Sequence, residues 1–244
     1  MYRYSLNPTK HSTLEEKIAV CRSLCIPALE LDGTVDGTAF HAMTNDQIED
    51  ARQLLIGAGV AVVLAQLNCD LNDDAAVRSW FRTAQWLGVE NVLFPAPAEG
   101  ETELTYLARL ERPFAYAKSY GMGRLLTHSK EGLLATEEGL TQVVKSLDGA
   151  GVIVDPMLQA ALGHSAYMDC CYKSRLKNAI FMIRATDGLN TGEAMLPGAG
   201  VAQVREFVSL MLARSFGGYF SVAPYGGYEL PQIIDALRAE LKRM

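Results

Sequence analysis

The stretch Gly57-Ala58-Gly59-Val60-Ala61-Val62-Val63-Leu64 joins the end of one structural element to the start of the next. Glycine commonly closes a helix in the left-handed conformation, and the residues from Val60 to Leu64 are all apolar. A strand without polar alternation is typical of a parallel sheet, because helices cover its outer face. The stretch therefore predicts a helix that ends at a glycine and leads into a buried parallel strand.

The same succession recurs along the chain, for example at Leu87-Gly88-Val89 and at Tyr120-Gly121. Short apolar runs alternate with longer amphipathic stretches, which is the pattern of repeated βα units. Strands are predicted at 2–7, 28–32, 60–67, 91–95, 124–128, 151–155, 180–186 and 218–223, each followed by a helix. Eight units, without a glycine-rich phosphate fingerprint after the first strand, favour a closed barrel over an open nucleotide-binding sheet.

The length of 244 residues is close to what an eightfold barrel needs, so we expect one α/β domain, a single (β/α)₈ TIM barrel, over residues 1–244. Two helix starts are predicted by capping boxes, in which an N-cap hydroxyl and the side chain three residues later satisfy each other's backbone donors. They are Ser12-Thr13-Leu14-Glu15 and Thr44-Asn45-Asp46-Gln47.

The composition of the chain limits the kinds of partner that we expect the protein to bind. No apolar run approaches the roughly 18 residues that would span a bilayer, and the N-terminus lacks a secretion signal, so we expect no membrane association and a cytoplasmic location. The five cysteines show no metal-ligand spacing, and reduced thiols are expected. The net charge of −6 is spread along the chain without a Lys/Arg cluster, which argues against nucleic-acid binding. Homo-oligomerisation stays open.

Several segments, in order, resemble one protein family. Leu14–Ile18 followed by Ala28–Leu31 resembles that family's first helix and acidic second strand. Ala84–Val92 resembles its entry to the fourth strand, with the pattern A-x-x-L-G-x-x-x-V. Ile183–Asp187 and then Pro197–Gly200 resemble its V-H-x-K-D strand and G-x-G turn. The family is the sugar phosphate isomerase/epimerase branch of the xylose isomerase-like TIM-barrel superfamily, and the resemblance covers nearly the whole chain.

That resemblance implies a divalent cation at the C-terminal mouth of the barrel, bound by Glu, Asp, His and Glu from strands five to eight. The corresponding positions in this chain are Thr127, Asp155, Arg184 and Ala223, and a further family histidine is replaced by Leu158. Only the aspartate is kept. The resemblance therefore implies a degenerate metal site.

Physical chemistry supports that interpretation. A hard cation needs several oxygen donors, and a catalytic Zn²⁺ takes about three protein ligands. The permanent charge of Arg184 would repel a cation beside it. We therefore expect no metal and no cofactor. Arg184 can instead hold a carboxylate, a phosphate or an enolate oxygen, while Asp155 orients it or acts as a base. Alternatively, the two form a salt bridge that plugs an inactive mouth.

Other candidate site residues lie at predicted strand ends. Glu30 ends the second strand and could pair with Asp155 in acid–base chemistry. His128 follows the fifth strand and could act as a base, or as a metal ligand together with Asp155 if that strand is shifted by one residue. The candidates for substrate binding are Asn7, Asn68, Asp187 and Tyr225. Ordinary loop polarity would also explain these four.

Three functions are open from the sequence. The first is an isomerase or epimerase of a small sugar or polyol derivative, phosphorylated or not, that works without a metal. The second is a non-catalytic relative that binds a polyhydroxylated or anionic small molecule, or a partner protein. The third, an endonuclease-type member, would need a His- and Glu-rich zinc cluster and a basic surface, and the sequence disfavours it.

Overall fold

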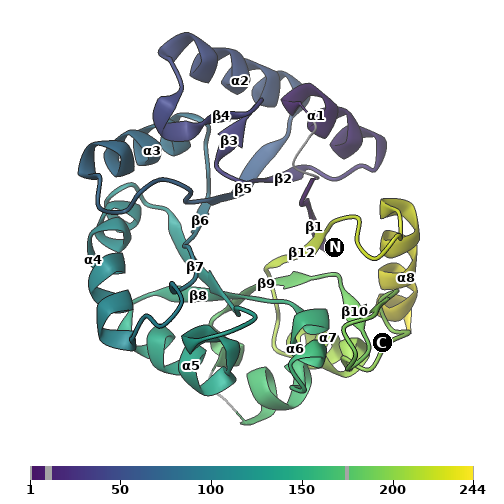
Figure 1. The fold of residues 1–244 in the computed structure, drawn as a ribbon. Coiled ribbons are helices and arrows are strands. Elements are labelled where there is room, and N and C mark those ends of the chain that lie inside the picture. Colours follow the sequence, from purple (N-terminus) through teal and green to yellow (C-terminus); the bar gives the residue numbers. More distant parts are fainter. Residues whose placement is uncertain (1, 9–12, 174–175, 244) are drawn as a thin grey trace. The chain divides into compact units, whose positions relative to one another are not determined.

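The computed structural model describes residues 2–8, 13–173 and 176–243. Eight parallel strands close into a barrel with the neighbour order β1-β12-β9-β8-β7-β6-β5-β2, as Figure 1 shows. The barrel strands are β1 (Arg3–Leu6), β2 (Ala28–Leu31), β5 (Ala61–Gln66), β6 (Asn91–Leu93), β7 (Gly123–Thr127), β8 (Ala150–Val154), β9 (Ile180–Arg184) and β12 (Tyr219–Val222). All eight were predicted from the sequence, so the (β/α)₈ fold class is confirmed.

A helix follows each barrel strand. These helices are α1 (Leu14–Ser23), α2 (Asn45–Ala58), α3 (Asp74–Trp86), α4 (Glu103–Ser119), α5 (Glu137–Ser146), α6 (Pro156–Ala161), α7 (Val204–Ala213) and α8 (Leu230–Lys242). Short additions are the hairpins β3 (Thr34–Val35) with β4 (Thr38–Ala39) and β10 (Asp187–Gly188) with β11 (Ala194–Met195), three 3₁₀ turns (Phe40–Ala42, Leu133–Ala135, Leu176–Asn178) and a π-helix (Ala166–Lys173). None of the helices in the described ranges is long and apolar enough to cross a membrane.

The predicted helix boundaries are partly confirmed. The capping box of Thr44 and Gln47 is present, and Gly59 ends α2 in the left-handed conformation with φ +66°. The first capping box is one residue later than predicted. Thr13 accepts from the amide of Glu16 (3.2 Å), and the Glu16 carboxylate accepts from the amide of Thr13 (2.9 Å), while Ser12 lies outside the described residues.

The chain divides into two compact units. The first comprises Met1–Tyr4, Ala96–Glu101 and Leu126–Met244, and the second comprises Ser5–Pro95 and Thr102–Leu125. Each has its own aromatic cluster: in the first, Phe220 packs against Phe216 and Tyr4, and in the second, Trp80 packs against Phe40 and Phe81.

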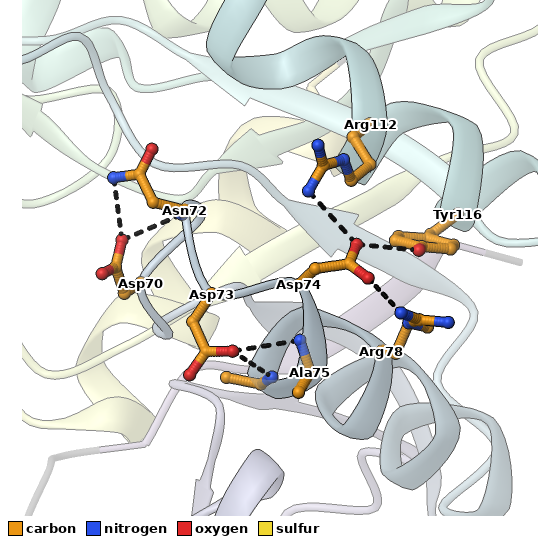
Figure 2. A network of polar contacts seen from close by, with 9 residues as sticks. Asp70, Asn72, Asp73, Asp74, Ala75, Arg78, Arg112 and Tyr116 are labelled. Atoms are coloured by element: carbon orange, nitrogen blue, oxygen red, sulfur yellow. Dashed lines mark hydrogen bonds and ion pairs between the residues drawn. The ribbon is translucent and has the colours of Figure 1, made fainter.

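Asp74 links two helices of the second unit. Its carboxylate accepts hydrogen bonds from the hydroxyl of Tyr116 (2.9 Å) and the guanidinium of Arg112 (3.3 Å) on α4, and it also binds Arg78 on its own helix, as Figure 2 shows. The hydrogen bond from Tyr116 is the largest of the causes that lower the pKa of Asp74. Because Asp74 is the first residue of α3, its charge also suits the positive end of the helix dipole.

The two tryptophans of α3 provide a matched test of the second unit's core. Trp80 is fully buried, with ring centroids 5.4 Å from Phe40 and 5.1 Å from Phe81, whereas Trp86 is 55% exposed. We predict that Trp80→Ala lowers the free energy of unfolding by about 3 to 5 kcal/mol because it leaves a large cavity. Trp86→Ala should change it by less than about 1 kcal/mol. Urea unfolding followed by circular dichroism measures both, and equal losses would contradict this packing.

Candidate functional site

Three neighbouring barrel strands place polar residues side by side at their C-terminal ends. In the register of the sheet, Val154 of β8 is paired with Ile183 of β9, so Asp155 follows beside Arg184. Arg184 is in turn paired with Ser221 of β12. Adjacent strands are about 4.8 Å apart, so Asp155, Arg184 and Ser221 lie next to one another in a row across three strands. We call these three residues the strand-end row.

The strand-end row faces the inside of the barrel. Phe220 packs on Phe216, which follows α7, so it lies on the helix-covered face of β12. Successive side chains of a strand point to opposite faces, and Ser221 therefore points inward. Active sites of TIM barrels are built at this end of the strands, where the βα loops begin.

Ser221 orients the guanidinium of Arg184. The half-buried Arg184 donates from Nη1 to the hydroxyl oxygen of Ser221, which is 2% exposed. A guanidinium has five N–H donors in a rigid plane and stays charged throughout the physiological pH range. The guanidinium therefore places a permanent positive charge at the end of β9, and its hydrogen bond to Ser221 of β12 sets the orientation of its plane.

Asp155 serves as the N-cap of α6. Its Oδ1 accepts from the amide of Leu158 (3.2 Å) and from the hydroxyl of Thr186 (2.6 Å). The hydrogen bonds described for Asp155 are with Leu158 and Thr186, and the one described for Arg184 is with Ser221, so a salt bridge between Asp155 and Arg184 stays a prediction. Both hydrogen bonds described for Asp155 use Oδ1, so Oδ2 is the oxygen that can accept from a ligand.

Asp187 is buried with no exposed surface, and its carboxylate binds the chain's own backbone. Its Oδ1 accepts from the amides of Gly188 (2.8 Å) and Ala202 (3.1 Å). Its Oδ2 accepts from the amides of Gly198 (2.9 Å) and Gly200 (3.0 Å). The sequence suggested a substrate-binding role, but both oxygens are directed at the loop that follows β9.

Tyr225 is joined to the same loop. Its hydroxyl donates to the carbonyl of Met195 (2.6 Å) and accepts from the amide of Asp187 (3.2 Å). Burial raises the pKa of Tyr225 above its usual range, and the nearby carboxylates of Asp187 and Asp155 raise it further. The phenol therefore stays protonated, and its hydroxyl connects the segment after β12 to hairpin β10–β11.

His128 lies on the other face of its strand. Arg124 of β7 stands over the ring of Phe114 on α4, with 5.8 Å from its guanidinium carbon to the ring centroid, so even-numbered positions of β7 face the helices. His128 shares that parity and is 3% exposed, and both of its ring nitrogens lack a hydrogen-bond partner within the described residues. Burial lowers its pKa from 6.5 to about 4, and the charge of nearby His164 contributes to a lesser extent.

The remaining candidates belong to the second unit. Glu30 is 3% exposed and accepts from the hydroxyl of Ser5 (2.7 Å). Asn68 accepts from the indole N–H of Trp80 (3.2 Å), and half-buried Asn7 follows β1. Of the eight candidates, four therefore lie at the ends of β8, β9 and β12, namely Asp155, Arg184, Asp187 and Tyr225. The roles of all eight in catalysis or binding stay predictions.

Sequence reasoning did not identify Ser221 and Thr186 as site residues. Thr186 lies two residues after Arg184 and therefore on the same face, where it donates to Asp155. Ser221 lies two residues before Ala223, the position of the missing glutamate. A signal for both existed in the alternation of the strands, because it places Thr186 on the face of Arg184 and Ser221 on the face of Ala223.

The donors at this site do not fit a divalent cation. Within the described ranges, no group of three or more His, Cys, Asp and Glu side chains lies close enough to bind a metal ion. In the strand-end row, Asp155 supplies one carboxylate, and Arg184 places a cation beside it. A Mg²⁺ or Zn²⁺ site would need more donors and no neighbouring guanidinium.

Known structures share this fold. No family model matches the chain, and no curated protein matches it in sequence. A D-tagatose 3-epimerase-like protein superposes with a TM-score of 0.75 at 15% identity, covering 98% of this chain and 97% of that one. A xylose isomerase domain protein from Planctomyces limnophilus gives 0.74 at 12% identity, covering 99% and 97%. A xylose isomerase-like TIM barrel protein from Mycobacterium smegmatis, in complex with magnesium, gives 0.70 at 14% identity, covering 99% and 96%.

These identities establish the architecture and not the activity. The chain shares the TIM-barrel fold of these structures, and it covers them over almost their full length.

The buried His128 predicts a loss of stability in acid. An unfolded chain takes up this proton near pH 6.5, whereas the folded chain resists it until about pH 4. Stability is therefore complete above pH 6.5 and falls as the pH drops towards 4, by up to about 3 kcal/mol. Urea unfolding at a series of pH values should show this fall in the wild type.

Two variants separate the causes of that fall. His128→Gln should flatten the profile between pH 6.5 and 4, because no group then has to remain uncharged in the core. His164→Gln should flatten it only slightly, since burial outweighs the charge of His164. An unchanged profile in His128→Gln would mean that another group causes the acid sensitivity.

Proposed function

We propose that the protein is an isomerase or epimerase of small anionic sugar or polyol derivatives and that it works without a divalent metal ion. The observation that carries this proposal is the strand-end row, in which a carboxylate and a guanidinium lie on neighbouring strands at the end where TIM barrels bind substrates. The related folds include a D-tagatose 3-epimerase-like protein, which supports a sugar-like ligand.

Arg184 supplies the charge for ligand binding. Its planar fork matches the geometry of a carboxylate or phosphate, with two parallel hydrogen bonds. A guanidinium has five N–H donors, and Nη1 of Arg184 donates to Ser221. The same charge would stabilise an oxygen that becomes negative during the reaction, a task that a metal ion performs in other enzymes.

Asp155 supplies the base. Its Oδ1 is fixed by Leu158 and Thr186, and Oδ2 would take a proton from the carbon next to the substrate carbonyl. The electron pair of the broken C–H bond moves to the carbonyl oxygen, where Arg184 stabilises the enolate. If Asp155 delivers the proton to the former carbonyl carbon while the hydroxyl proton of the adjacent carbon moves to the former carbonyl oxygen, the product is an isomer. If a water molecule instead protonates the original carbon from the opposite face, the carbonyl re-forms and the product is an epimer.

A second candidate is a non-catalytic binder of the same class of ligand. The observation that favours it is the capping role of Asp155, because a carboxylate that completes a helix N-terminus has a structural reason to be present. The magnesium in the Mycobacterium smegmatis protein is a property of that protein, and the reaction proposed for this chain uses no metal ion.

Binding by Arg184 is testable by substitution. Arg184→Lys should weaken binding of a sugar acid about ten-fold despite its conserved charge, because an ammonium group cannot give the two-point contact. Arg184→Met should weaken it by about a hundred-fold, the equivalent of a lost charge-assisted pair. Calorimetric titration with gluconate, glucuronate and glucose 6-phosphate measures the affinities. Equal affinities in wild type and Arg184→Met would make Arg184 a structural residue.

Catalysis is testable by proton exchange with solvent. In D₂O with EDTA, the wild type should incorporate deuterium next to the carbonyl of a substrate, followed by NMR, and Asp155→Asn should abolish incorporation while retaining ligand binding. Asn keeps an oxygen that can cap α6, so the fold should persist. Binding without exchange would support the non-catalytic candidate. Exchange that requires added Mg²⁺ or Mn²⁺ would contradict the metal-free mechanism.

A further inference from the structure

The loop between β9 and α7 is organised around one buried carboxylate. Asp187 begins the loop, and its two oxygens accept four backbone amides at 2.8 to 3.1 Å, with no exposed surface. Three of these amides come from the segment 198–202, where they belong to alternate residues. Backbone N–H groups that converge on one concavity bind an anion there, and we call the concavity formed by these four amides the nest. Here the anion is part of the chain.

The loop backbone approaches the carboxylate so closely that glycine is required. A Cβ atom on Gly200 would lie 2.3 Å from Oδ1 of Asp187 and 2.6 Å from the carbonyl oxygen of Gly188. The amide of Val201 donates to that same carbonyl (2.9 Å). The nest is therefore a closely packed arrangement that depends on the carboxylate at its centre and on the absence of a side chain at Gly200.

This loop supports the elements that carry the strand-end row. Hairpin β10–β11 pairs Asp187 with Met195, whose carbonyl accepts from the hydroxyl of Tyr225. At Gly188, a Cβ atom would lie 2.7 Å from Cγ of Met157 on α6, so the hairpin packs directly on that helix. Asp155 caps the same helix. The loop thus connects Asp187 to the helix that holds Asp155.

We propose that Asp187 is a positioning residue that acts as the built-in anion of this nest, and that the nest binds a small carboxylate from solution when the Asp187 carboxylate is removed. Four charge-assisted hydrogen bonds hold residues 188–202 against α6 and Tyr225. Asp187 would organise the loop in this way whether or not the strand-end row is catalytic. A purely space-filling role for Asp187 would give no response to added anions.

The experiment is amide hydrogen exchange on Asp187→Ala with and without formate, which is a carboxylate on a single carbon. Without formate, the amides of Gly198, Gly200 and Ala202 should exchange about ten-fold faster than in wild type or more, because each loses a hydrogen bond to a charged group. Formate should restore their protection, and chloride at equal ionic strength should not. The wild type should not respond to formate.

Asp36→Ala is the matched control. The Asp36 carboxylate accepts a hydrogen bond from the amide of Leu14 (2.6 Å), the first residue of α1. The variant therefore removes a carboxylate that binds a backbone amide, but it does not empty a nest. Its exchange should be insensitive to formate. A formate effect of equal size in Asp36→Ala and Asp187→Ala would overturn the proposal, and so would loop amides in Asp187→Ala that exchange as in wild type.

Asp187→Asn decides the matter if Asp187→Ala does not fold. Asparagine fills the same space but replaces one acceptor oxygen with an NH₂ group, which must face two amide donors. One pair of loop amides should then exchange faster while the amides of β8 and β9 keep their protection, and formate should give no rescue because the space is occupied. Wild-type exchange at all four amides would contradict the proposal.

Discussion

The permanent charge of Arg184 is the constraint on which the rest of the site depends. A guanidinium does not release its proton in a protein, so Arg184 brings a permanent positive charge to the end of β9. A hydrogen bond to Ser221 on β12 fixes the position of that charge, and register places Asp155 on its other side. A cation beside it would be repelled, and an anion would be attracted. This is the physical basis of the anionic ligand that we propose.

Two aspartates at neighbouring strand ends show how environment separates structural from chemical roles. Asp187 is buried and accepts four backbone amides, so its hydrogen-bonding capacity is used within the chain. Asp155 is half-buried and uses Oδ1 for Leu158 and Thr186, so Oδ2 can take part in chemistry. The first carboxylate organises the loop, and the second is the one that we propose as the base.

Several strands were predictable because a left-handed glycine after a helix precedes the apolar run, as at Gly59, Gly88 and Gly121, and that signal is local. The adjacency of Asp155 and Arg184 was predictable because parallel strands align their C-terminal ends. The role of Asp187 was not, since its partners are backbone amides of residues 198–202, and amides are the same in every sequence. Ser221 was missed for a related reason, because its partner lies 37 positions away. The contact between Arg124 and Phe114 was needed to show that His128 lies on the helix-covered face of its strand.

The central claim is that Arg184 takes the place of a metal ion in holding an anionic ligand at the strand-end row. A crystal structure of the protein grown with Mn²⁺ and a bound sugar acid, with anomalous diffraction recorded at the manganese edge, tests it most directly. The account predicts the ligand carboxylate within hydrogen-bonding distance of the Arg184 guanidinium and no anomalous peak beside Asp155. A manganese peak coordinated by Asp155, with the ligand bound to that ion, would contradict it.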